Sequence, residues 1–76
     1  MDTTIRDRKH ELQMVNDFLA ARHGETLDAI GAMNRMMELW DIKIDWHVFA
    51  TVLDRMDRTE TAYKTEISSR PKYYIK

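Results

Sequence analysis

Apolar residues recur at helical spacing through most of the chain and change to a two-residue alternation near its end. In the first part, Leu12, Val15 and Leu19 stand at i, i+3 and i+7, which places them on one side of a helix. This pattern predicts a first helix over residues 4–23, with residues 1–3 frayed ahead of it.

Two more helices follow from the same spacing. Thr26 has the side chain of an N-cap and predicts the start of a second helix over residues 26–39. Asp45 is the expected N-cap of a third helix over residues 45–57, and residues 41–44 alternate as an extended connector or a short strand would. The three stripes predict a core of Leu12, Val15, Leu19, Leu27, Ile30, Phe49, Leu53 and Met56.

The last fifteen residues, AYKTEISSRPKYYIK, alternate and are rich in Tyr, Ile and Thr. A polar break at residues 68–71 predicts a β-hairpin with strands near 62–67 and 71–76. Pro71 cannot donate a ladder hydrogen bond, so it is expected at the turn or at the first position of the second strand. The alternation predicts that Tyr73 and Ile75 point inward and that Lys72, Tyr74 and Lys76 point outward.

Three helices followed by a basic hairpin resemble the winged helix-turn-helix domains of bacterial and phage regulators. HGETLDAI is similar to the passage from the first helix into the helix-turn-helix, WHVFATVLDRM to a recognition helix, and SSRPKYYIK to the wing. The expected fold class is mainly α with a C-terminal β-hairpin, a three-helix winged helix-turn-helix in one domain over residues 1–76. The chain departs from the family in the long gap between Trp40 and Asp45, where a short turn is usual.

The charge of the chain is unevenly distributed around a net value of −1. Residues 11–61 carry five basic and ten acidic side chains, whereas residues 62–76 carry four basic side chains and one acidic one. If the basic ends meet on one side, they make a surface for an anion such as DNA. Chance clustering of solvated charges in short segments explains the same distribution equally well.

The sequence lacks the motifs of several other classes. It has no Cys, no H-E-x-x-H and no glycine-rich phosphate loop, so we expect no enzyme activity, no cofactor and no metal site. The charged N-terminus has no apolar signal region, and no apolar run is long enough to span a bilayer. We therefore expect a cytoplasmic protein without a membrane partner.

The resemblance implies a DNA-binding protein with a regulatory or accessory role, acting on double-stranded DNA as a homodimer. The third helix would then read the major groove, and the wing would contact the backbone. The residues expected to bind DNA are His47, Thr51, Arg55, Lys64, Arg70, Lys72 and Tyr74.

The alternative is a protein-interaction module of the same fold, an adaptor or inhibitor from a phage or mobile element, with an acidic binding surface. Trp46 and Met36 are its candidate interface residues, because exposed Trp and Met side chains suit such contacts. The position of Asp45, Asp54 and Asp57 discriminates between the two hypotheses. If they surround the exposed side of the third helix, the protein-binding hypothesis gains.

Overall fold

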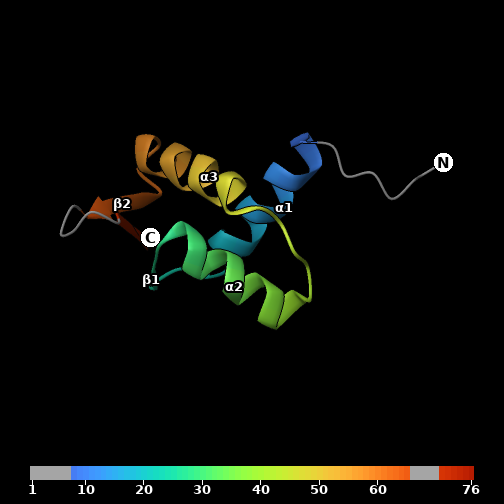
Figure 1. Cartoon of the computed structure of the whole chain (residues 1–76). Helices are drawn as coiled ribbons and strands as arrows, with labels where there is room; N and C mark the ends of the chain where they lie inside the picture. Colours follow the sequence, from blue (N-terminus) through green and yellow to red (C-terminus); the bar gives the residue numbers. More distant parts are fainter. Residues whose placement is uncertain (1–7, 66–70) are drawn as a thin grey trace.

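A computed structural model of the protein describes residues 8–65 and 71–76. Its helices are α1 (Arg8–Ala20), α2 (Ala29–Trp40) and α3 (Trp46–Arg58). Its strands are β1 (Thr26–Leu27), β2 (Ala62–Thr65) and β3 (Lys72–Ile75), which form one antiparallel sheet. In Figure 1, α2 and α3 run across the view with α1 behind them, and the sheet lies at the end where the chain leaves α3. The predicted mainly helical class with a C-terminal hairpin is confirmed.

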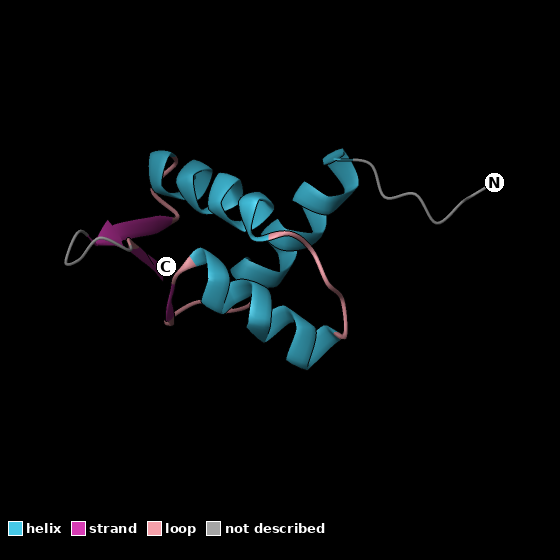
Figure 2. Ribbon diagram, viewed as in Figure 1, coloured by secondary structure: helices cyan, strands magenta, loops and turns pink. Residues whose placement is uncertain are grey.

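The sheet has β3 at its centre, with β1 on one side and β2 on the other (Figure 2). Thr26 pairs with Tyr74, so the expectation that Thr26 caps a helix is wrong. A hydrogen bond of 2.6 Å from the Gly24 amide to the Ile75 carbonyl extends this pairing. Gly24 itself has φ +88, a left-handed conformation that glycine adopts without a Cβ clash.

The N-cap of α2 is Asp28. Its Oδ1 accepts a 2.8 Å hydrogen bond from the Gly31 amide. A Cβ at position 31 would collide with the same carboxylate, so glycine makes room for the cap. At the other end, Asp41 adopts φ 57 and its amide donates to the Met37 carbonyl. The helix therefore starts three residues later than the sequence predicted.

The end of the first helix also differs from its prediction by three residues, whereas the bounds of the third differ by one. The helix α1 ends at Ala20 and continues as a turn to Gly24, while its predicted start and the frayed residues 1–3 lie outside the described residues. Asp45 precedes α3 as predicted, but its carboxylate bonds the His47 ring and not a helix amide. The connector before Asp45 is extended without strand pairing.

The core lies where α3 packs against α1, α2 and the sheet. It includes Val15, Leu19, Leu27, Phe49, Leu53 and Met56 from the predicted set, and Leu12 is half-buried against it. The prediction that Ile30 belongs to the core is wrong, since 39% of this residue is exposed. The inner side of α2 runs through Ala32 and Met36. Leu27, which was expected to share an inner stripe with Ile30, belongs to β1 and not to the helix.

The side of α2 that faces the core decides which methionine is buried and which meets solvent. Met36 is fully buried, so its prediction as a protein-interface residue is wrong. Met37, the next residue, is 43% exposed. The inward positions of Tyr73 and Ile75 and the outward position of Tyr74 are confirmed by their burial. None of the helices within residues 8–65 is long and apolar enough to cross a membrane.

The burial of Leu53 leads to a stability prediction. Leu53 is fully buried on the inner side of α3, and Leu53→Ala should lower the free energy of unfolding by about 2–5 kcal/mol, through lost transfer energy and a cavity. Thr51→Ala, on the exposed side of the same helix, should change it by less than about 0.5 kcal/mol. Urea unfolding of both variants measures this, and equal effects would contradict the assigned core.

Candidate functional site

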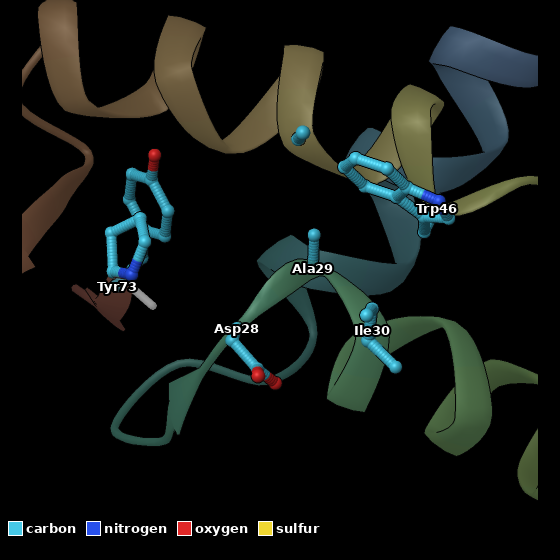
Figure 3. Close-up of a pocket in the computed structure, with 7 residues that line it drawn as sticks. Asp28, Ala29, Ile30, Trp46 and Tyr73 are labelled. Atoms are coloured by element: carbon cyan, nitrogen blue, oxygen red, sulfur yellow. The ribbon is translucent and has the colours of Figure 1, made fainter. Parts of the chain in front are cut away.

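An apolar groove of about 240 Å³ opens between the start of α2, the first two turns of α3 and the start of β3. Figure 3 shows Ile30 and Trp46 near each other at one end of this groove and Tyr73 at the other. We call it the α2–α3 groove. Its lining residues are Asp28, Ala29, Ile30, Trp46, Ala50, Pro71 and Tyr73.

Local structure explains why these side chains meet. Trp46 and Ala50 stand at i and i+4 on α3, so they share one side of the helix, and the small Ala50 leaves the floor open. Ile30 lies in the first turn of α2, on the side opposite the buried Ala32 and Met36. Trp46 is 41% exposed, so two large apolar side chains meet solvent at this end.

The Tyr73 end of the groove is held to α3 by a hydrogen bond. The Tyr73 hydroxyl donates to Asp54 Oδ1 at 2.8 Å. Burial of the ring, helped by the hydrogen bond and the negative charge of Asp54, raises the pKa of Tyr73 to about 12. A second link lies nearby, where Asp57 Oδ1 accepts from the Lys64 amide at 3.1 Å. The two carboxylates thus fix the hairpin against the third helix.

The Trp46 end is held by its own neighbours. The Trp46 ring stacks on the His47 ring with centroids 3.9 Å apart. His47 Nδ1 lies 3.2 Å from Asp45 Oδ2. The hydrogen bond from His47 lowers the pKa of Asp45 below its usual value. A carboxylate therefore stands beside this end of the groove as well.

The acidic side chains of α3 occupy its accessible side. Asp54 is exposed and follows His47 by seven residues, which puts the two on one side of the helix. Asp45 lies at the helix start and Asp57 is half-buried beside the hairpin. The arrangement is the one that favours the protein-binding hypothesis, because carboxylates at this side repel phosphate.

The apolar surface continues along α2 beyond the groove. Met33 and Met37 stand three and seven residues after Ile30, on the same side of the helix. They line a second hollow together with Asn34 and Lys43. A partner seated in the α2–α3 groove would meet this apolar strip if it extended along α2.

Three of the residues expected to bind DNA lie on α3. His47 and Thr51 are exposed on one side of the helix, where the Thr51 hydroxyl donates to the His47 carbonyl at 3.0 Å. Arg55 follows Thr51 by four residues on the same side, at the edge that borders α1, and lines a hollow there together with Lys9.

The predicted wing residues are divided between the two faces of the sheet. Lys64 pairs with Tyr73 across the hairpin, so both side chains lie on the face of the sheet that meets the helices. Lys72 and Tyr74 lie on the opposite face, because neighbouring positions in a strand alternate. Arg70 lies outside the described residues.

Sequence reasoning found Trp46 but missed Ile30, Ala50 and Pro71 as groove residues. The signal for Ile30 was present in Asp28 and Gly31, an N-cap followed three residues later by a residue that leaves room for its carboxylate. Ala50 and Pro71 carry no local signal, since their role depends on how α3 and β3 meet.

Comparisons with protein-family models, with curated proteins and with solved structures gave no match for this chain. Within the described residues, no group of three His, Cys, Asp or Glu side chains is placed to hold a metal ion.

The Tyr73–Asp54 hydrogen bond leads to a prediction on pH dependence. The pKa of Tyr73 is about 12 in the folded chain and about 10 in an unfolded one, so unfolding releases its proton between these values and stability falls as the pH rises. Tyr73→Phe should lack this contribution and lose about 0.5–1.5 kcal/mol at neutral pH with the hydrogen bond. Urea unfolding at several alkaline pH values measures both effects. Parallel losses in the two proteins would contradict the prediction.

Proposed function

We propose that this chain is a winged-helix module that binds a protein partner in the α2–α3 groove. The observation that carries the proposal is an apolar groove with a carboxylate beside each end, Asp45 near Trp46 and Asp54 on Tyr73. A reader of duplex DNA needs cations on this side of its third helix.

The order of elements supports a winged-helix fold. One strand separates the first two helices, and a hairpin follows the third, in the order α1-β1-α2-α3-β2-β3. The first strand joins the sheet beside the last one, giving β1-β3-β2. In this proposal α3 is the recognition helix and the β2–β3 hairpin is the wing, and both border the groove.

The size of the groove favours a side chain over a small-molecule ligand. Pockets for small molecules usually have volumes of about 300–1,000 Å³, and this groove is smaller and open. Trp is among the residues enriched in interface hot spots, and Trp46 is exposed at this groove. The groove therefore suits one large apolar side chain of a protein segment.

The charges beside the groove favour a cationic segment. Asp45 and Asp54 lie near its two ends, and the Asp28 carboxylate at the start of α2 borders it. Among the described strand residues, Lys64 is the cation on the same face of the sheet as Tyr73. Charge complementarity would then speed association and select partners with Arg or Lys around the apolar residue.

A peptide selection tests this proposal. Random peptides displayed on a carrier should yield binders with one large apolar residue flanked by Arg or Lys. Ala50→Trp fills the groove and should abolish their binding, whereas Ala21→Trp, at an exposed site after α1, should leave it unchanged. Asp54→Asn should weaken binding by about two- to tenfold if its charge contributes about 0.5–1.5 kcal/mol.

Thermal unfolding confirms that each variant is folded, and Ala50→Leu replaces Ala50→Trp if the larger side chain disturbs α3. Selected peptides that bind Ala50→Trp as tightly as the original protein would contradict the proposal. A selection that returns acidic peptides would contradict the assigned partner charge.

Binding of double-stranded DNA is the second candidate function. It is favoured by the exposure of His47 and Thr51 on one side of α3 and by Lys72 on the hairpin that would be the wing. It ranks second because Asp54 stands on the same side of α3 as the two readers.

A salt titration distinguishes this second candidate. If Lys72 meets a phosphate, Lys72→Ala should flatten the log–log dependence of duplex affinity on salt by about 0.9. Lys43→Ala, in the connector between α2 and α3, is the matched control and should leave the slope unchanged. Changes at His47 or Thr51 should alter sequence preference instead. No duplex binding at low salt by a folded sample would rule this candidate out.

A further inference from the structure

Within residues 8–65 and 71–76, no helix or strand covers the face of the sheet that points away from the helices. Its residues follow from the strand register, in which Tyr63 pairs with Tyr74 and Thr65 with Lys72. Thr26 of β1 lies on the same face through its pairing with Tyr74. We call this surface the outer sheet face.

Two tyrosines dominate the outer sheet face. The Tyr63 and Tyr74 rings are nearly parallel, with an interplanar angle of 10° and centroids 6.5 Å apart. They are 53% and 40% exposed, so both offer ring surface to solvent. The Lys76 ammonium lies 4.5 Å from the centre of the Tyr63 ring, which adds a cation to the platform.

The charge of this face is positive. Lys72 and Lys76 are exposed, and among the described strand residues the outer sheet face carries no carboxylate. The carboxylates of Asp54 and Asp57 contact the hairpin through Tyr73 and Lys64, which belong to the helix-facing side of the sheet. The two faces of the sheet therefore differ in the sign of the charge that surrounds them.

Protection of a sheet edge does not explain Tyr74. Lysines on an edge strand prevent pairing with another chain. Here β3 is the central strand, since β2 pairs with all four of its residues and β1 pairs with Tyr73 and Tyr74. The Tyr74 and Lys72 side chains lie together on one face of the sheet, where a ligand above the sheet would reach both.

We infer that the outer sheet face binds single-stranded nucleic acid, with unpaired bases stacked on Tyr74 and Tyr63 and phosphates on Lys72 and Lys76. Aromatic rings beside cations are the combination that such proteins use. A duplex hides the faces of its bases within its own stack, so stacking on these rings selects a single strand. The inference does not depend on the α2–α3 groove.

The experiment uses a labelled oligothymidylate of about ten nucleotides, within the range of one small binding site, and fluorescence anisotropy at low salt. Tyr74→Ala should weaken binding by about five- to a hundredfold, from the loss of one stacked base. Tyr74→Phe is the matched control and should retain affinity. Lys72→Gln should flatten the salt dependence by about 0.7.

Trp46→Ala, in the groove, should leave oligothymidylate binding unchanged, so this inference and the proposed function can fail separately. Four results would overturn the inference: no binding by the folded protein, equal affinities of Tyr74→Ala and Tyr74→Phe, equal affinity for a duplex of the same length, or equal affinity for a polyglutamate chain. The last result would show that negative charge of the ligand is sufficient for binding.

Discussion

The placement of Tyr73 on the central strand is the constraint on which both surfaces depend. Its ring is buried, and its hydroxyl reaches Asp54 on α3, so the strand cannot turn over without breaking this contact. A slip of one residue would send Tyr73 outward and Tyr74 into the core. Because the register is fixed, Tyr73 closes one end of the groove while Tyr74 and Lys72 face the opposite direction.

Much of the fold could be predicted because periodicity reports burial directly. The stripe of Phe49, Leu53 and Met56 placed α3 within one residue of its observed bounds, and alternation assigned the faces of Tyr73 and Tyr74. β1 escaped prediction because two residues are too few to show alternation, and its pairing with β3 spans almost fifty positions of sequence. Because β1 was missed, the second helix was predicted to start too early, and Ile30 was predicted to lie in the core with Leu27.

The candidate site was less predictable, since it depends on how elements meet. Trp46 was identified from its place in the first turn of the third helix, beside the connector. Lys64 and Lys72 look equivalent in sequence, but the register puts them on opposite faces. Arg55 comes four residues after Thr51 on the same side of α3 and borders α1, where it lines a hollow with Lys9. A list of cations cannot show that Lys64 and Lys72 lie on opposite faces of the sheet.

The separation of acidic from basic side chains by the sheet explains how a chain with a net charge of −1 presents two surfaces of different charge. Carboxylates gather on the accessible side of α3, while lysines gather beyond the sheet. At physiological salt, charges on opposite sides of the sheet are partly screened from each other, since the Debye length is about 8 Å. Each surface therefore attracts its own ligand, and total charge says little about either. The β3 strand divides them, and so the proposed protein contact and the inferred nucleic-acid contact are compatible within one small domain.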